Sequence, residues 1–383
     1  MRIIKHIARI LFGITFIFSG FVKGIDPWGS AYKFTDYFNA MGMEWLLWSA
    51  FPLGVFLAFA EFTIGVAFLF NISIRFFSWL GLLFMAFFLP LTLWVAIKNP
   101  VTDCGCFGDA LVISNWATFY KNLVLMAFAI IVLKYRNKMD WKWGEKPGFI
   151  LGLITIFAYI FIVFYSYNHL PIIDFRPYKV GVNIPDAMKI PENAPKDIYE
   201  NTFYYKNKKT GEVQKFTEEN YPWQDTLNWE YDNMESKLVQ EGYKPSIHDF
   251  MIQSAEGDDV KDFFIHDENY VFMLIAYNLD KSSRKSQEEI NNLAGWAQEN
   301  GYSFICITSS LPDQSAVFAE ETGAPYEFFT CDEITLKTII RSNPGLLVLK
   351  NGDILGKWHY NDIPTPEEFK GWEKQIGKMR LEE

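Results

Sequence analysis

Residues 76–97 read FFSWLGLLFMAFFLPLTLWVAI, an apolar stretch of 22 residues that contains no charged side chain. A helix of roughly 20 apolar residues is long enough to cross the ~30 Å hydrocarbon layer of a bilayer. Four further apolar stretches of comparable length occupy residues 4–22, 45–70, 111–133 and 149–167. The sequence therefore predicts an integral membrane protein with five membrane-spanning helices in the first ~170 residues.

The first apolar stretch has two interpretations. Arg2, Lys5 and Arg9 stand at or before its start, which is also typical of a cleaved signal peptide. No clear small-x-small cleavage site follows, and four more apolar stretches do. We therefore expect the first stretch to remain as a transmembrane helix.

Charge divides the 383 residues into two unlike parts. Residues 1–170 carry 13 Lys and Arg against 8 Asp and Glu, a net charge of +5. Residues 171–383 carry 22 against 37, a net charge of −15. We expect a basic membrane part in contact with the lipid bilayer and an acidic soluble part. The acidic part argues against nucleic acid as a partner, because phosphates require a basic surface.

Basic residues predict the orientation of the spans, since they concentrate in cytoplasmic loops. With the N-terminus in the cytoplasm, nine Lys and Arg lie on the cytoplasmic side and three lie in the loops opposite. The nine are Arg2, Lys5, Arg9, Arg75, Lys134, Arg136, Lys138, Lys142 and Lys146, and the three are Lys23, Lys33 and Lys98. Five crossings then place the C-terminal part outside. In a bacterium this predicts the inner (plasma) membrane with a periplasmic domain, in a compartment where disulfides persist.

A Cys-x-Cys motif lies between the third and fourth apolar stretches, on the outer side in this orientation. Residues 103–108 read Asp-Cys-Gly-Cys-Phe-Gly. A metal site needs about four ligands, and no His or third Cys is near in sequence, so we predict no metal. Cys104 and Cys106 are then either a structural disulfide or idle thiol pair, or a redox-active pair. A Cys-Gly-Cys ring strains normal disulfide geometry, and strained, exposed disulfides exchange readily.

Glu61 and Lys121 are charged residues that lie well inside the predicted spans, where a charge is costly and is a functional hypothesis by default. Lys121 could face the cysteine loop and favour a thiolate, or it could extend to the outer surface. Glu61 could pair with Lys23 or Lys121, relay protons to a redox centre, or form a structural hydrogen bond between helices. We predict Lys121 and Glu61 as supporting charges for the cysteine pair.

The soluble part begins with a Pro-rich segment at residues 168–195, which indicates an extended linker. Residues 202–206 and 213–216 flank the sequence Lys-Lys-Thr-Gly and predict a β-hairpin. Residues 232–240 have the pattern of a short amphipathic helix.

Strands and helices alternate after residue 244. Two apolar strands, at residues 271–277 and 302–308, flank a helix at 286–300, and this alternation predicts a mainly parallel sheet covered by helices. Residues 346–350 and 354–358 flank Asn-Gly and predict a closing hairpin.

This α/β region resembles a thioredoxin-like domain of the TlpA or peroxiredoxin type over residues 243–377. The resemblance rests on strand order, on the Asn351-Gly352-Asp353 turn, and on Ser342-Asn343-Pro344-Gly345, where Pro344 stands at the cis-proline place of the family. Where that family carries Trp-Cys-x-x-Cys-Arg, residues 279–284 read Leu-Asp-Lys-Ser-Ser-Arg.

Asp280 and Ser283 therefore replace both sulfurs of that motif. Because neither side chain can perform thiol–disulfide exchange, the resemblance implies a degenerate, non-catalytic binding module. A similar α/β fold of unrelated ancestry is the alternative. Cys306 and Cys331 occupy no catalytic place in the family, and we expect buried core thiols or a structural bridge.

The membrane part resembles the DoxX family over residues 1–135 in its first motif, and its cysteine motif is similar to the MauE branch of the same superfamily. Ser19-Gly20-x-x-Lys23 closes the first span and is followed by Asp26-Pro27 and a turn of small residues, while Cys-Gly-Cys-Phe-Gly precedes a helix. The resemblance implies a bundle of about four helices, linked to quinone or thiol redox chemistry and to maturation of exported proteins. A membrane quinone is thus a candidate cofactor, although no sequence pattern marks its pocket.

These observations predict four parts of the chain. They are a DoxX/MauE-like four-helix membrane domain (1–135), a basic cytoplasmic loop with a fifth span (136–170), a periplasmic linker with a hairpin and helix (171–242), and a degenerate thioredoxin-like domain (243–383).

Two functional hypotheses follow. In the first, a bacterial inner-membrane protein of thiol–disulfide redox or envelope protein maturation exchanges electrons between Cys104/Cys106 and a periplasmic or membrane protein partner, which docks on the thioredoxin-like domain. In the second, the chain is a non-catalytic scaffold subunit of a protein export or envelope biogenesis complex. The Cys-Gly-Cys motif favours the first hypothesis and the missing Cys-x-x-Cys favours the second, so the sequence does not decide whether the protein is an enzyme.

Overall fold

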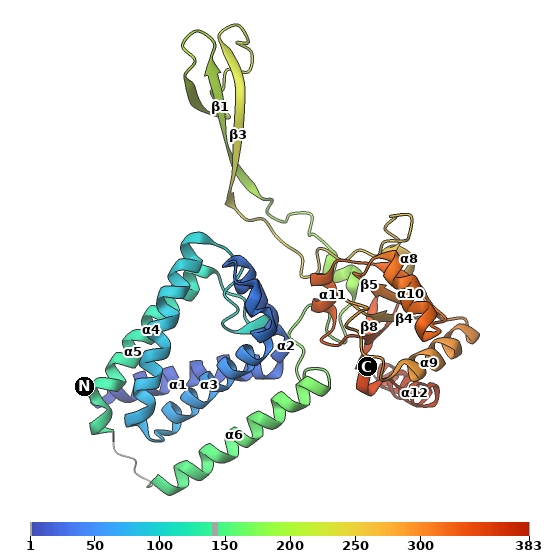
Figure 1. Ribbon diagram of the computed structural model, residues 1–383, viewed down its shortest axis with the longest axis horizontal. Coiled ribbons are helices and arrows are strands. Elements are labelled where there is room, and N and C mark those ends of the chain that lie inside the picture. Colours follow the sequence, from blue (N-terminus) through green and yellow to red (C-terminus); the bar gives the residue numbers. More distant parts are fainter. Residues whose placement is uncertain (1, 140–144, 383) are drawn as a thin grey trace. The chain divides into compact units, whose positions relative to one another are not determined.

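The structure is a computed structural model that describes residues 2–139 and 145–382. The chain divides into two compact units. One unit is formed by Met1–Val182 together with Met251–Glu383 and contains a bundle of long helices and an α/β domain. The other unit is Asn183–Phe250 and contains a small sheet (Figure 1).

Five helices of the bundle are long and apolar enough to cross a membrane, as predicted. Part of the expected basic loop, residues 140–144 with Lys142, lies outside the described residues. The bundle contains, in chain order, α1 (Arg2–Ile25), α2 (Pro27–Ala40), η1 (Glu44–Ser49), α3 (Ala50–Phe70), α4 (Ile74–Lys98), η2 (Gly108–Ala110), α5 (Asn115–Tyr135), η3 (Arg136–Lys138) and α6 (Glu145–Asn168).

Small residues bring α1 and α3 into close contact. A Cβ atom on Gly20 would lie 2.6 Å from the backbone nitrogen of Phe62, and one on Gly65 would lie 2.6 Å from that of Ile17. Glycine is therefore required at both crossings, as is common where membrane helices pack closely. The packing places the C-terminal half of α1 directly against the middle of α3, where Glu61 lies.

The short helix α2 corrects the predicted turn of small residues after the first span. Asp26 is its N-cap, with a carboxylate oxygen that accepts a hydrogen bond from the backbone nitrogen of Gly29 at 2.8 Å, and Pro27 occupies the first helical position. An acidic N-cap followed by proline is a helix-start signal. Asp26-Pro27 therefore marks the start of a helix and not a turn.

The α/β domain has a five-stranded sheet in the order β6-β5-β4-β7-β8. Strands β4, β5 and β6 are parallel, and β7 is antiparallel to both β4 and β8. This confirms the predicted β-α-β unit with a closing hairpin, in the thioredoxin-like order. The elements are α8 (Lys261–Ile265), β4 (Tyr270–Ile275), α9 (Gln287–Glu299), β5 (Ser303–Thr308), α10 (Pro312–Thr322), β6 (Glu327–Thr330), α11 (Glu333–Ile339), β7 (Gly345–Lys350), β8 (Asp353–His359), η4 (Tyr360–Asp362) and α12 (Pro366–Glu382).

Helices cover the central strands, and this explains their continuous apolar sequence. Five of the six residues of β4 are buried. On one face, Phe272 and Leu274 pack in a cluster with Ile290 and Leu293 of α9 and Phe369 of α12. The domain therefore has its own hydrophobic core.

The second unit contains α7 (Ile184–Met188) and an antiparallel sheet in the order β2-β1-β3. Strands β1 (Ile198–Asn207) and β2 (Val213–Thr217) form the predicted hairpin. The prediction of a helix at residues 232–240 is wrong. This segment belongs to β3 (Trp229–Gln240), which pairs along the whole of β1. Nearly every β3 side chain is exposed, so the segment has no apolar helix face to bury, and strand pairing overrides the weak local pattern.

Candidate functional site

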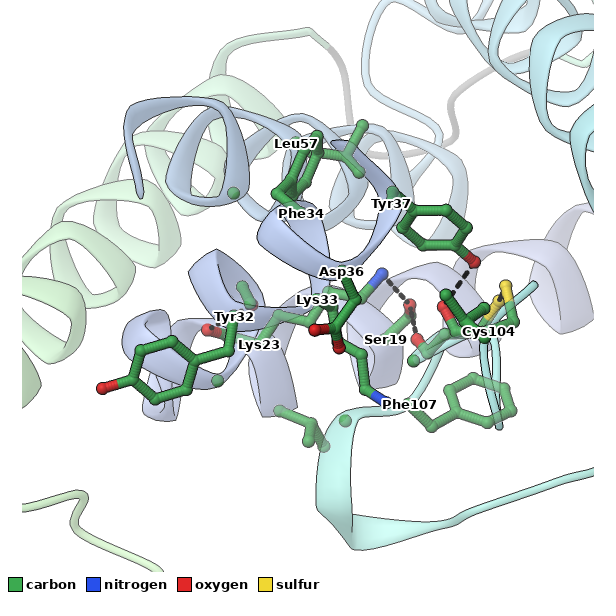
Figure 2. A pocket seen from close by; sticks show the side chains of 18 of the residues that line it. Ser19, Lys23, Tyr32, Lys33, Phe34, Asp36, Tyr37, Leu57, Cys104 and Phe107 are labelled. Carbon is green, nitrogen blue, oxygen red and sulfur yellow. Dashed lines mark hydrogen bonds between the residues drawn. The ribbon is translucent and has the colours of Figure 1, made fainter. Parts of the chain in front are cut away.

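A cavity of about 1030 Å³ lies beside the Cys-Gly-Cys loop. Side chains from several helices and from the loop line it, among them Glu61 of α3 and Lys121 of α5. Figure 2 shows Lys23 of α1 and Tyr37 of α2 beside Cys104 of the loop. The cavity thus brings the sequence-predicted cysteine pair and its two predicted supporting charges to one place.

The two thiols of the loop are free, and their Sγ atoms lie 3.0 Å apart. Gly105 between them has φ of +68°, in the left-handed region that glycine adopts without strain. Asp103 fixes this turn, because its carboxylate accepts a hydrogen bond from the Gly105 nitrogen at 2.8 Å and pairs with Lys33 of α2 at 2.7 Å. The loop therefore holds the two sulfurs in position to form or break a bond.

The two thiols differ in acidity. A hydrogen bond from the Cys104 thiol, together with the ammonium groups of Lys121 and Lys23, outweighs burial and lowers the pKa of Cys106 to about 6. The same hydrogen bond, together with burial, raises the pKa of Cys104 far above its usual range. The geometry therefore favours a Cys106 thiolate that accepts a hydrogen bond from a protonated Cys104.

Glu61 pairs with Lys23, one of the two partners considered from the sequence. The Lys23 Nζ atom lies 2.9 and 2.8 Å from the two carboxylate oxygens of Glu61. Only 12% of the Lys23 side chain and 7% of the Glu61 side chain are exposed. The two charges therefore cancel inside the bundle.

Ser19 links this ion pair to the cysteine loop. Its Oγ atom lies 2.8 Å from a Glu61 carboxylate oxygen and 2.6 Å from the Cys106 carbonyl oxygen. A hydroxyl has one proton, so Ser19 donates to one of these acceptors at a time. The sequence indicated no role for Ser19 beyond its place in the Ser-Gly-x-x-Lys motif. Its spacing of four residues from Lys23 indicates that the two side chains lie on the same face of the helix.

Lys121 lies at the cysteine loop, as one of its two sequence interpretations proposed. Its Nζ atom is 4.2 Å from the centre of the Phe107 ring, directly after Cys106. No ion pair joins Lys121 to a carboxylate within residues 2–139 and 145–382. Its ammonium group is therefore a positive charge that no neighbouring acid cancels.

Tyr37 is a site residue that the sequence did not reveal. Helix α2 directs its hydroxyl to the carbonyl oxygen of Cys104, to which it donates a hydrogen bond at 3.2 Å (Figure 2). Burial, followed by the neighbouring Cys104, raises the pKa of Tyr37 far above its usual range, so the hydroxyl stays protonated. Tyr37 thus contacts the first cysteine of the loop, and Ser19 contacts the second.

Arg341 of the α/β domain also contacts the neighbourhood of the loop. Its Nε atom lies 3.0 and 2.9 Å from the two carboxylate oxygens of Asp26, and an Nη atom lies 3.0 Å from Asp109. Its side chain is 6% exposed. Asp109 follows the cysteine motif, so this guanidinium joins the segment before Pro344 to the end of the loop.

The degenerate thioredoxin site contains no sulfur. Ser283 donates its backbone N–H to the carbonyl oxygen of Asn343 at 2.8 Å, and the Asn343–Pro344 peptide bond is cis. Asp280 accepts a hydrogen bond from Gln314 at 2.9 Å. Ser283 thus lies beside the Asn343–Pro344 bond, and Asp280 contacts α10 through Gln314.

Cys306 belongs to the core of the α/β domain. It lies in β5 opposite Phe328 of β6 and is fully buried. Burial raises the pKa of its thiol far above the usual range, so it is not a reactive nucleophile. Cys331 follows β6 and is also buried. Among the described residues, no group of three or more His, Cys, Asp or Glu side chains could hold a metal ion.

The bundle that carries this site has a family match. Residues 1–135 match the family model of the methylamine utilisation protein MauE. The N-terminal part is thus a MauE-type membrane domain, as the sequence resemblance predicted. The match ends with α5, so the MauE-type domain contains the first four spans and the whole cysteine loop.

The remaining comparisons concern the soluble parts. Residues 199–241 match a domain of unknown function, DUF8463. A search of curated proteins finds no match.

Solved structures that resemble the C-terminal region are thioredoxin-like proteins. A putative protein disulfide isomerase from Bacteroides thetaiotaomicron is 18% identical, with 34% of this chain and 85% of that chain covered and a TM-score of 0.26. A putative thioredoxin from Neisseria meningitidis is 11% identical, with coverages of 34% and 88% and a TM-score of 0.27. An uncharacterized conserved protein from Geobacillus kaustophilus is 16% identical at a TM-score of 0.24, and the match covers 28% of this chain and 64% of that chain, less than two thirds of its length.

Proposed function

We propose that this chain is a thiol–disulfide redox protein of the bacterial inner membrane that exchanges electrons through Cys104 and Cys106. The observation that carries the proposal is the arrangement of the two Sγ atoms, 3.0 Å apart at the wall of a large cavity. Two ammonium groups near Cys106 support it, because they favour the thiolate, which is the reactive form of a cysteine.

The exchange reaction balances between the cysteine pair and the two thiols of a partner protein. In the oxidised pair, a thiolate of a partner dithiol attacks the Cys104 Sγ atom, the bond between the two sulfurs breaks, and Cys106 leaves as a thiolate. The second partner thiol then attacks the mixed disulfide and releases Cys104. Two electrons pass from the partner to the pair, and the partner gains a disulfide. Cys106 is the better leaving group because it is the more acidic thiol.

The thioredoxin-like domain serves in this proposal as a docking module for a periplasmic or membrane protein. Asp280 and Ser283 supply polar groups beside a cis proline and no sulfur. The domain therefore binds the partner, while the membrane domain carries out the exchange.

The predicted quinone fits the cavity in chemical character. Apolar side chains of Phe84, Phe88 and Leu57 line it beside the Lys23–Glu61 pair. These rings and chains would hold a flat apolar carrier, and the Lys23 ammonium would hydrogen-bond a carbonyl oxygen. A quinone bound there would supply a two-electron acceptor.

The scaffold hypothesis remains the second candidate, and the absence of sulfur at residues 279–284 favours it. In that account the bundle would pack against a protein export or envelope biogenesis complex, and the cysteine pair would be structural. Both accounts share the same orientation, with a cytoplasmic N-terminus and a periplasmic C-terminus.

The orientation gives a direct prediction. Alkaline phosphatase fused after residue 383 is expected to be active, since this enzyme folds only where its disulfides can form, and the nine-to-three distribution of Lys and Arg places the C-terminus outside. Phosphatase activity in intact cells is the measurement. Fluorescence from a C-terminal fusion that matures only in the cytoplasm would contradict five crossings in this direction.

The docking role gives another prediction. The full chain carrying Cys104→Ser and Cys106→Ser should be unable to reduce insulin disulfides, because the thioredoxin-like domain has no sulfur at Asp280 and Ser283. Insulin turbidity in detergent with dithiothreitol as electron source measures this. If the double variant reduces insulin and Cys306→Ser then abolishes the reaction, the active thiol was assigned to the wrong domain.

A further inference from the structure

We propose that the Cys104–Cys106 disulfide takes up two electrons with a single proton, and that Lys121 is the positioned counter-ion of the Cys106 thiolate that results. This inference rests on the proposed function and adds the proton stoichiometry and the role of each sulfur. It follows from counting the charges that face the pair.

Every other cation around the loop already has an acidic partner within the described part of the chain. Lys23 of α1 pairs with Glu61 of α3, and Lys33 of α2 pairs with Asp103 of the loop. Asp109 and Asp26 share Arg341. The remaining groups are Tyr37, which donates to Cys104 as a neutral phenol, and Asp36 of α2, which lies near Lys33 and Asp103.

Lys121 of α5 is the exception within the described part of the chain, since only the Phe107 ring faces its ammonium group. The ring attracts a cation but carries no charge. With a disulfide in the loop, Lys121, Lys23 and Glu61 together leave one positive charge in a largely buried region. A buried charge without an opposite charge is unfavourable, and a thiolate at Cys106 removes the imbalance.

The second sulfur keeps its proton. The Sγ atoms lie 3.0 Å apart, so one thiol proton serves the contact. The pKa of Cys104 is raised and that of Cys106 is lowered to about 6, which assigns this proton to Cys104. The balanced half-reaction above pH ~6 is then one disulfide, two electrons and one proton giving a Cys104 thiol and a Cys106 thiolate. Below that pH the thiolate gains a proton and the reaction consumes two.

The test is the pH dependence of the redox equilibrium of the purified full-length protein in detergent, titrated against a thiol–disulfide buffer of known potential. If the pair takes up one proton, the equilibrium constant of its two-electron half-reaction should change tenfold per pH unit between pH 6.5 and 8. This corresponds to a shift of about 30 mV per pH unit in the reduction potential of the pair. Two protons would give a hundredfold change, or about 59 mV. The tenfold dependence supports the inference, and the hundredfold dependence in the wild type overturns it.

Variants at Lys121 test the counter-ion. Lys121→Met should steepen the dependence in this pH range from tenfold toward a hundredfold, because the Cys106 pKa rises from about 6 toward the ordinary value of about 8.5. Lys121→Arg keeps the charge and should keep the tenfold dependence. Lys98→Met removes an exposed lysine at the end of α4 and serves as the matched control. An unchanged dependence in Lys121→Met would overturn the assignment of Lys121.

Failure of this inference is distinguishable from failure of the proposed function. A wild-type pair that forms no disulfide at any buffer potential, as measured by thiol alkylation, would contradict the redox function itself, and with it the proton count. A pair that titrates normally with a two-proton dependence would leave the redox function standing and overturn the proton count alone.

Discussion

Glu61→Ala is expected to lower the free energy of unfolding by about 3–5 kcal/mol, the typical cost of removing one partner from a buried ion pair. The two carboxylate oxygens of Glu61 accept from Lys23 at 2.9 and 2.8 Å, and Ser19 contacts the same carboxylate. Without Glu61, the ammonium of Lys23 would lie among the helices with no opposite charge. Unfolding of the purified protein in mixed micelles, followed by tryptophan fluorescence, measures the effect.

A double variant separates loss of the pair from loss of the carboxylate. Lys23→Met with Glu61→Leu removes both charges and should recover most of the stability, since apolar replacements of a buried ion pair are often neutral or stabilising. Glu61→Ala with a stability within about 0.5 kcal/mol of the wild type, the range of ordinary surface substitutions, would show that the Lys23–Glu61 contact is not a buried pair.

Complete loss of cellular function is expected from Cys104→Ser combined with Cys106→Ser. Serine cannot take part in thiol–disulfide exchange, and no other cysteine of the chain lies at the cavity. Complementation of a deletion strain, with protein levels checked by immunoblotting, is the measurement. Cys306→Ser is the control, because this buried core residue lies in β5 and outside the cavity. A double variant that complements fully would leave only the scaffold function.

The fold was largely predictable because its signals are local. Long apolar stretches mark the five spans, and continuous apolar strands with an Asn-Gly turn mark the α/β sheet. The error at residues 232–240 has the opposite cause. That segment has a short helical pattern, with Met234 and Leu238 four positions apart. It nevertheless becomes β3 because β1 offers a full-length partner, which a local pattern does not reveal.

The candidate site was predictable as a set of residue types but not as a network. Cysteines close in sequence and charges inside apolar spans stand out in any sequence of this kind. Ser19, Tyr37 and Arg341 did not stand out, because a serine, a tyrosine and an arginine are ordinary in their local contexts. Their roles come from contacts across 87, 67 and 315 positions of the chain, which only the packing of the helices and domains creates.

The sequence allowed either Lys23 or Lys121 as the partner of Glu61. The structure has Lys23 as the partner, and the packing of α1 against α3 explains why. The glycine contacts bring the C-terminal half of α1 next to Glu61, whereas α5 directs Lys121 to Phe107. Because Lys23 neutralises Glu61, Lys121 remains as the charge available to a thiolate.

The most direct test of the central claim is the trapping of a mixed disulfide in living cells by the single variants. Cys106→Ser should accumulate a covalent complex with the partner at Cys104, because exchange is reversible and passes through such an intermediate. In the reverse direction the Cys104 thiolate attacks the disulfide of the oxidised partner and displaces one partner thiolate, and the Cys106 thiolate that would release the partner is missing. Non-reducing electrophoresis after acid quenching and alkylation is the measurement, and the wild type should cycle between disulfide and dithiol in the same cells. A wild-type pair fixed in one state, with no reductant-sensitive complex from either Cys106→Ser or Cys104→Ser, would contradict the redox account.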